Sequence, residues 1–208
     1  MGAMSLQVVD HPLAAHLVTG LRCVKTEPES FRRMAHTLST ILILEATRDV
    51  ETSQESVETP LEFTDSPRLT RGLAVVPVLR AGLSMLESAL ALFPDVAVGY
   101  IGLERHHESA IANSYYSKLP ELADRTVLCV DPMLATGGSA SQALSLLKAS
   151  GAVRPRLVSV IAAPEGVARI QTDHPDVPIY VAVLDRELNE LKYILPGLGD
   201  YGDRLYGT

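Results

Sequence analysis

The sequence predicts an α/β fold in which a mostly parallel, twisted sheet is covered by helices on both faces. Short apolar runs rich in β-branched residues recur along the chain, as is typical of strands buried on both faces of a parallel sheet. Stretches with apolar residues at helical spacing lie between these runs, and such alternation favours a parallel sheet. The 208 residues, 47% of them hydrophobic, suffice for one well-packed domain, residues 1–208, since no repeat or low-complexity linker divides the chain.

The N-terminal part is predicted to hold an extended arm, a long helix and a hairpin. After the arm, which contains His11, the segment Glu29–Val50 has a helix start at Ser30 and a long apolar stripe suited to covering the core. Glu51–Thr70 is polar, with prolines between short alternating stretches. This pattern favours a hairpin at the edge of the sheet, where proline is tolerated.

Two more strands are predicted before the pattern breaks. Gly72–Leu79 is an apolar run followed by a small-residue turn and a helical run, Leu83–Phe93, and Asp95–Leu103 forms the next strand. Glu104–Asn113 loses all periodicity and is predicted as a solvated loop. The adjacent histidines in this loop do not indicate a metal site, because neighbouring residues rarely direct both imidazoles at one ion.

The stretch Thr126–Lys148 combines a strand, a small-residue loop and a helix. Asp131 stands at the carboxyl end of an apolar strand, and Ala135–Ser139 consists of small residues that lead into the helix. A helix N-terminus has unpaired N–H donors and a partial positive charge, and glycines let an anion approach the backbone. The stretch therefore predicts a phosphate site. An ordinary turn capped by Ser139 would use the same small residues but would not need the acid.

Arg80 is a second candidate for anion binding. It follows the strand Gly72–Leu79, and ligands collect at the carboxyl ends of strands in open α/β sheets. As a mere surface residue, this arginine would place a positive charge at the unfavourable end of a helix dipole. A bound anion would compensate for it.

The C-terminal third is predicted as strand, helix and strand, followed by a folded lid. The strand Arg156–Ala162, the helix Pro164–Asp173 and the strand Val177–Leu184 continue the alternation. Gly197–Gly202 matches the spacing G-x-G-x-x-G, but only six residues follow it, too few for the helix and distant acid of a dinucleotide site. Apolar residues on both sides of these glycines would anchor the tail from Leu188 onward as a lid.

Charge and cysteine content narrow the functional classes. The formal net charge is −7, so the basic footprint of a nucleic-acid binder is missing. Two cysteines, Cys23 and Cys129, are too few for a disulfide framework. No apolar run approaches the ~20 residues that cross a bilayer, and the N-terminal residues do not show the basic-then-apolar pattern expected of a signal peptide. We expect a cytoplasmic protein that binds neither nucleic acid nor membrane.

Four segments carry a resemblance to a known family. VDPMLATGGS, Val130–Ser139, resembles the phosphoribosyl-diphosphate (PRPP) loop of the type I phosphoribosyltransferases. Pro132 replaces the second acid of most such loops, which is similar to the uracil phosphoribosyltransferase branch. Resemblance to that branch also covers PVLRAG (Pro77–Gly82), AAPEG (Ala162–Gly166) and YILPGLGDYGDRLYGT (Tyr193–Thr208). The resemblance thus spans nearly the whole chain.

The resemblance implies the type I phosphoribosyltransferase fold and transfer of the phosphoribosyl group of PRPP to N1 of uracil, which yields UMP and diphosphate. Arg80 and Arg105 would stabilise the leaving pyrophosphate, and Asp131 would meet the ribose hydroxyls. The 5′-phosphate would be held by Thr136–Ser139. Beside Arg80, Arg105 and Asp131, the positions assigned to PRPP are Pro132, Met133, Leu134, Ala135, Thr136, Gly137, Gly138, Ser139 and Asp200.

The resemblance also implies a base-binding hood at about residues 188–208, completed by the N-terminal arm. Its uracil-contacting positions would be Tyr193, Ile194, Gly199, Asp200 and Tyr201. Mg²⁺ would be bound mainly through PRPP, without a set of protein ligands, since Mg²⁺ usually binds through substrate phosphates. GTP is a candidate activator, and a homodimer or larger homo-oligomer is expected.

The predicted loop Glu104–Asn113, which contains Arg105, departs from the family pattern at Glu104, His106 and His107.

Two alternatives stay open on the sequence alone. One is a regulator built on the same fold that binds nucleotide and RNA, against which the acidic charge balance argues. The other is a different type I transferase that acts on a purine or on orotate.

Overall fold

The computed structural model describes residues 6–105 and 112–208. Within them, a nine-stranded main sheet has the order β1-β11-β10-β8-β4-β6-β7, with β5 beside β4 and β9 beside β10. Its strands are β1 (Leu6–Val8), β4 (Gly72–Leu79), β5 (Ala97–Val98), β6 (Tyr100–Arg105), β7 (Ala112–Lys118), β8 (Arg125–Val130), β9 (Met133–Leu134), β10 (Pro155–Ala162) and β11 (Ile179–Leu184). Neighbouring strands are parallel except β6 and β7. The predicted fold class is confirmed.

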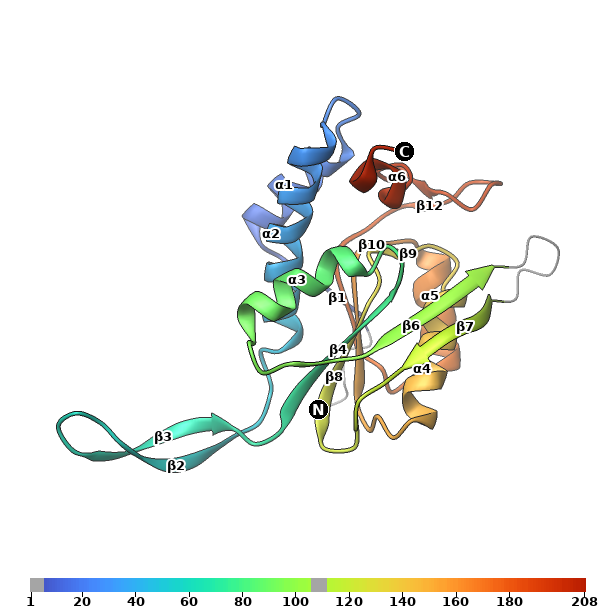
Figure 1. Cartoon of the computed structure of the whole chain (residues 1–208). Coiled ribbons are helices and arrows are strands. Elements are labelled where there is room, and N and C mark those ends of the chain that lie inside the picture. Colours follow the sequence, from blue (N-terminus) through green and yellow to red (C-terminus); the bar gives the residue numbers. More distant parts are fainter. Residues whose placement is uncertain (1–5, 106–111) are drawn as a thin grey trace.

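Helices cover both faces of this sheet (Figure 1). They are α1 (Pro12–Arg22), α2 (Pro28–Ala46), α3 (Leu83–Leu92), α4 (Gly138–Ala149), α5 (Pro164–Asp173) and α6 (Tyr201–Tyr206). Successive strand residues point to opposite faces: in β8, Leu128 and Val130 join the apolar cluster under α1, α2, α3 and α6, whereas Val127 and Cys129 join the cluster under α4 and α5. The core therefore has two layers, one on each face.

The helix α1 was missed by the sequence analysis, which predicted an extended arm there. The side chain of His11 caps this helix by accepting from the Leu13 N–H at 3.1 Å. Ala14, Val18 and Leu21 lie one helical turn apart and are buried. The polar and glycine residues between them hid this spacing, which was nevertheless present in the sequence.

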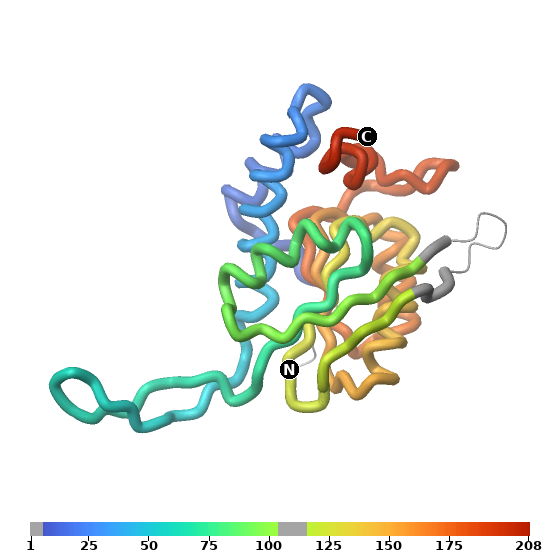
Figure 2. The backbone as a smooth tube through the Cα atoms, viewed as in Figure 1, coloured from blue at the N-terminus to red at the C-terminus, as the bar shows by residue number. Residues whose placement is uncertain are grey.

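The hairpin predicted for Glu51–Thr70 exists, but not at the edge of the main sheet. Strands β2 (Thr52–Glu58) and β3 (Phe63–Leu69) form a separate antiparallel sheet that projects from the body (Figures 1 and 2). Nearly all of its residues are exposed, Phe63 by 69%. The hairpin lacks the apolar face that would hold it against the main sheet, and β1 and β7 form the edges instead.

The segment Glu104–Asn113 is more regular at its ends than predicted. The backbones of Glu104 and Arg105 continue β6 and pair with Asn113 and Ala112 of β7. The strand β7 was not predicted because Ala112–Lys118 is mostly polar. The centre of the predicted loop, with His106 and His107, lies outside the described residues, as do the side chains of Glu104 and Arg105.

The C-terminal tail folds over the carboxyl ends of the strands, as a lid would (Figure 1). Strands β12 (Glu187–Leu188) and β13 (Ile194–Leu195) form a small antiparallel sheet, and α6 follows. In the part of the chain that the structure describes, no helix is both long and apolar enough to cross a bilayer.

Candidate active site

The predicted phosphate loop joins β8 to α4. Gly137 caps α4 in the left-handed region, at φ 77°, and a Cβ added there would lie 2.8 Å from the Gly166 carbonyl oxygen. A Cβ on Gly166 would in turn lie 2.5 Å from the Ala135 carbonyl oxygen. Both glycines are thus required where the loop packs against the start of α5. Because Gly137 has no side chain to cap α4, the first N–H groups of this helix are available to an anion.

A second tight turn lies beside the first, at the end of β4. The Gly82 N–H donates to the Val78 carbonyl oxygen at 2.9 Å, and a Cβ on Gly82 would lie 2.5 Å from the carbonyl oxygen of Val130 in β8. The peptide bond between Leu79 and Arg80 is cis. Since β4 and β8 are parallel neighbours, this packing brings Arg80 and Asp131 to the same edge of the sheet, as predicted.

The hood is anchored by Tyr201, which is 1% exposed. Its ring packs edge-on against Phe31 of α2, with ring centroids 5.2 Å apart, and its hydroxyl lies 3.2 Å from Oγ of Ser84 in α3. Burial raises the pKa of Tyr201 to about 12, and the Ser84 contact opposes this shift. Tyr201 therefore stays neutral at physiological pH and ties the hood to two helices.

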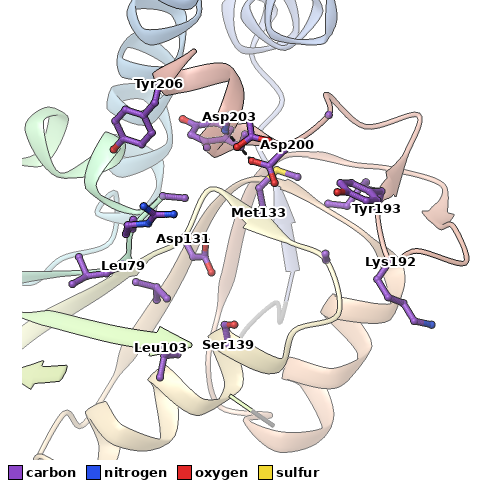
Figure 3. A pocket seen from close by; sticks show the side chains of 18 of the residues that line it. Leu79, Leu103, Asp131, Met133, Ser139, Lys192, Tyr193, Asp200, Asp203 and Tyr206 are labelled. Carbon is purple, nitrogen blue, oxygen red and sulfur yellow. Dashed lines mark hydrogen bonds between the residues drawn. The ribbon is translucent and has the colours of Figure 1, made fainter. Parts of the chain in front are cut away.

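A cavity of about 880 Å³ lies between the strand ends and the hood. Figure 3 shows Asp131 at the strand end, with Asp200 and Asp203 of the hood on the opposite side. Ten residues assigned to PRPP or uracil from the sequence line it: Arg80, Asp131, Met133, Ala135, Ser139, Tyr193, Ile194, Gly199, Asp200 and Tyr201. The structure thus brings residues assigned to PRPP and residues assigned to uracil to one cavity.

Other predicted site residues do not line the cavity. Pro132 and Leu134 are buried, and the Pro132 carbonyl oxygen accepts from the N–H groups of Val160 and Ile161 at 3.0 and 3.1 Å. These residues hold the loop against β10. Thr136, Gly137 and Gly138 complete the turn into α4 without lining the cavity. For Arg105 only the backbone is described; it continues the strand that brings Leu103 to the cavity.

The carboxylate of Asp200 has a structural role that the sequence analysis did not predict. Its Oδ1 caps α6 by accepting from the Asp203 N–H at 2.9 Å, as the dashed line in Figure 3 shows. A carboxylate at this position is favourable because it meets the positive end of the helix. Part of the function of Asp200 is therefore to shape the hood.

Several lining residues were not predicted. Among them are Leu79, Ala81, Leu103, Lys192, Asp203 and Tyr206. Asp203 and Tyr206 belong to α6, a helix of six residues that the analysis did not predict. Lys192 lies at a positive φ of 67° in the turn between β12 and β13, and nothing in the residue type indicated this conformation.

The fold is shared with phosphoribosyltransferases of solved structure. A hypoxanthine-guanine phosphoribosyltransferase from Bacillus anthracis matches with a TM-score of 0.51, over 76% of this chain and 80% of that chain, at 11% sequence identity. At this identity the likeness concerns the fold alone. The fold class is thus the one found in these phosphoribosyltransferases of solved structure.

Closer relatives identify the family. A family model described as uracil phosphoribosyltransferase matches residues 8–208. The uracil phosphoribosyltransferase of Thermus thermophilus is 49% identical over 207 residues, which cover 99% of this chain and 100% of the relative. A solved structure from Aquifex aeolicus is 39% identical, with a TM-score of 0.93 and 98% of each chain covered. This chain belongs to the uracil phosphoribosyltransferase family.

Proposed function

We propose that this protein is a pentosyltransferase of pyrimidine salvage that transfers the 5-phosphoribosyl group of PRPP to N1 of uracil. The products are UMP and diphosphate. The observation that carries this proposal, beside family membership, is the single cavity that joins the phosphate loop and Arg80 to the hood. Such a cavity can hold a phosphorylated sugar and a base next to each other.

The sheet side of the cavity suits PRPP. The N-terminus of α4 with Thr136–Ser139 would hold the 5′-phosphate, and Asp131 would accept hydrogen bonds from the ribose hydroxyls. Arg80, with Arg105 from β6, would stabilise the negative charge of the leaving diphosphate. As the bond from the anomeric carbon to the diphosphate oxygen breaks and the bond to uracil N1 forms, positive charge develops on the sugar. Catalysis then depends on positioning and electrostatic stabilisation.

The hood side suits uracil because it offers mainly backbone groups. Uracil presents an N3–H donor between two carbonyl acceptors, and a backbone carbonyl at Ile194 with N–H groups of Gly199 and Tyr201 would complement this pattern. Gly199 has φ of 81°, a conformation in which glycine exposes its backbone at little cost. Cytosine reverses the pattern at N3 and C4, so the same groups would disfavour it.

Magnesium fits this site through the substrate. Among the described residues, no group of three or more His, Cys, Asp or Glu side chains is placed to hold a metal ion, whereas Asp131 lines the cavity. One carboxylate plus substrate oxygens is a common environment for Mg²⁺. The ion, when bound with PRPP, would neutralise diphosphate charge, with Asp131 as its neighbour from this chain. Activation by GTP and homo-oligomer formation stay predictions from the family resemblance, and cytoplasmic location stays a prediction from the cysteine content.

Product analysis tests the proposal. The protein is incubated with labelled uracil, PRPP and Mg²⁺, and UMP and diphosphate are quantified separately. Equal amounts of both, formed only with PRPP, are expected. Nucleotide formation from a purine or orotate but not from uracil would refute the assignment. Retention on an RNA matrix at low salt, without product formation, would instead favour the RNA-binding regulator.

A further inference from the structure

A partly buried ion pair contacts the turn of the hood at Gly197. Asp185 follows β11 at the carboxyl end of the sheet, and Arg22 is the last residue of α1. Arg22 Nη1 donates to Asp185 Oδ2 at 2.9 Å and Nη2 donates to Oδ1 at 2.5 Å. The side chain of Asp185 is 3% exposed and that of Arg22 is 25% exposed. The two side chains thus meet in a bidentate pair, the strongest geometry for arginine and a carboxylate.

This pair also holds both backbone polar groups of Gly197. The Gly197 N–H donates to Asp185 Oδ2 at 2.8 Å, and the Gly197 carbonyl oxygen accepts from Arg22 Nη1 at 2.7 Å. Gly197 lies between Ile194 and Gly199, which both line the cavity. Its φ is 64°, and an added Cβ would lie 2.1 Å from the Ile194 carbonyl oxygen. The ion pair therefore holds the tight turn between Ile194 and Gly199, two positions proposed to bind uracil.

Leu198, the residue after Gly197, is held by a second arginine, Arg204. Arg204 of α6 donates from Nη1 to the Leu198 carbonyl oxygen at 2.9 Å and from Nη2 to the Cys23 carbonyl oxygen at 2.6 Å. Arg204 Nη1 also donates to the Leu21 carbonyl oxygen. The end of α1 and the Gly197–Leu198 turn are thereby joined twice, once by Arg22 of α1 and once by Arg204 of α6. None of the residues in these contacts belongs to the phosphate loop Asp131–Ser139.

The geometry points to a positioning role: we propose that Arg22 and Asp185 fix the Gly197 turn so that the backbone of Ile194 and Gly199 faces the base. This inference rests on the proposed function. Burying a charged pair is a costly way to gain stability, and an apolar pair of similar volume often stabilises equally well. This bidentate pair also forms hydrogen bonds with the N–H and the carbonyl oxygen of Gly197, and it thereby fixes the orientation of the backbone at this turn. The pair should therefore affect uracil recognition and leave PRPP binding unchanged.

Steady-state kinetics of the full chain with Arg22→Lys and Asp185→Asn test this role. Lysine keeps the charge but cannot form the arginine fork, and asparagine keeps the shape but loses the charge. We expect kcat/KM for uracil to fall about 10- to 100-fold, the loss typical of small misplacement. The KM for PRPP at saturating uracil should stay within about twofold of the unchanged protein. The preference for uracil over cytosine should fall together with uracil kcat/KM.

Arg156→Lys is the matched control. Arg156 has a side chain 12% exposed that binds Asp49 at 2.5 Å and the Ala46 carbonyl oxygen at 2.5 Å, and none of these residues lines the cavity. The control should lower the midpoint of thermal unfolding without changing either KM or the base preference. Because KM values and base preference do not depend on the fraction of folded enzyme, a variant that folds poorly still gives an answer.

The outcomes separate this inference from the proposed function. If the protein without substitutions forms no UMP, the proposed function is overturned, and the inference with it. An active protein whose Arg22→Lys and Asp185→Asn variants keep the base preference overturns the positioning role alone. Equal losses for PRPP and uracil, or the same losses in Arg156→Lys, would also overturn it, since these results describe general destabilisation.

Discussion

The phosphate loop and the hood line the same cavity but are built in different ways. Residues 131–137 connect β8 to α4 through the short strand β9, and this connection packs on β10 and α5, which follow α4 in the chain. The hood depends on residues far away in the sequence: Arg22 and Asp185 are 163 positions apart, and Arg32 donates to the Leu205 carbonyl oxygen from 173 positions away. The phosphate half is thus a local motif, and the base half is a product of tertiary packing.

This difference separates chemistry from recognition. A local motif with a strand-end acid and a helix N-terminus can bind a phosphorylated sugar in any member of the fold class. A hood formed by the C-terminal tail and held in place by α1 and α2 can change without disturbing that motif. Changes in the loop should therefore impair PRPP use with any base, whereas changes in the hood away from Asp200 should impair use of the base alone.

The largest expected effect comes from Gly199→Val in the hood. At φ of 81° a β-branched residue is strongly disfavoured, and its side chain would crowd the backbone that meets the base. We expect kcat/KM for uracil to fall by roughly 10²- to 10⁴-fold while PRPP binding stays measurable by calorimetry. Gly151→Val is the matched control, because Gly151 has φ of 94° with nothing within 4 Å of an added Cβ. Normal uracil kinetics in Gly199→Val would contradict the hood assignment.

The next effect contrasts two arginines on the PRPP side. Arg80 is held at a tight strand end, whereas Arg105 ends β6 next to the undescribed segment. Removal of a charge-stabilising donor typically costs roughly 10²- to 10³-fold in turnover. Arg80→Ala should raise the KM for PRPP and lower kcat together, and Arg105→Ala should chiefly lower kcat. Steady-state kinetics that give the same defects for both variants would refute this distinction.

Asp131→Asn should have a smaller effect, with the same size for every accepted base. Loss of a charge-assisted hydrogen bond to the ribose costs about 1.5–3 kcal/mol, or roughly 10- to 150-fold in kcat/KM. Asp176→Asn is a suitable control, because Asp176 pairs with Lys148 near the opposite end of α4 and is 58% exposed. Unchanged PRPP kinetics in Asp131→Asn would remove this carboxylate from the site.

The last effect concerns the anchor of the hood and is absent at neutral pH, because it appears only at high pH. Because burial raises the pKa of Tyr201 to about 12, the unfolded chain loses this proton at lower pH than the folded protein. The stabilising contribution is thus complete below about pH 10 and is lost as pH rises toward 12, by roughly 2–3 kcal/mol. Urea unfolding should show a shallower alkaline loss of stability in Tyr201→Phe. An identical pH dependence in both proteins would show that Tyr201 is not protected by the fold.

The features that could be predicted from the sequence are those that depend on local patterns, as the phosphate loop does. The strand Gly72–Leu79 and the helix Pro164–Asp173 have the predicted bounds, because a buried strand and a proline-started helix carry their own local patterns. Asp131 and Arg80 were each placed at the carboxyl end of a strand, where ligands collect in open α/β sheets. These residues needed no knowledge of distant contacts.

The missed features depend on the rest of the molecule. Helix α6 contains Gly202 and has six residues, too short to be stable alone, and it exists because Tyr201 packs on Phe31. The role of Arg22 could not be predicted, since its partner Asp185 and the turn at Gly197 reach it only through the complete fold. The projecting hairpin was misplaced because its polar strands pair with each other and not with the main sheet.

The most direct test of the proposed activity is kcat/KM for uracil, cytosine, hypoxanthine and orotate, measured in parallel with PRPP and Mg²⁺. A site that matches backbone donors and an acceptor to uracil should reject cytosine by roughly 10⁴-fold or more, because cytosine leaves buried polar groups unpaired. The two larger substrates should give no detectable nucleotide. Similar values for uracil and cytosine, or a preference for hypoxanthine or orotate, would contradict the account.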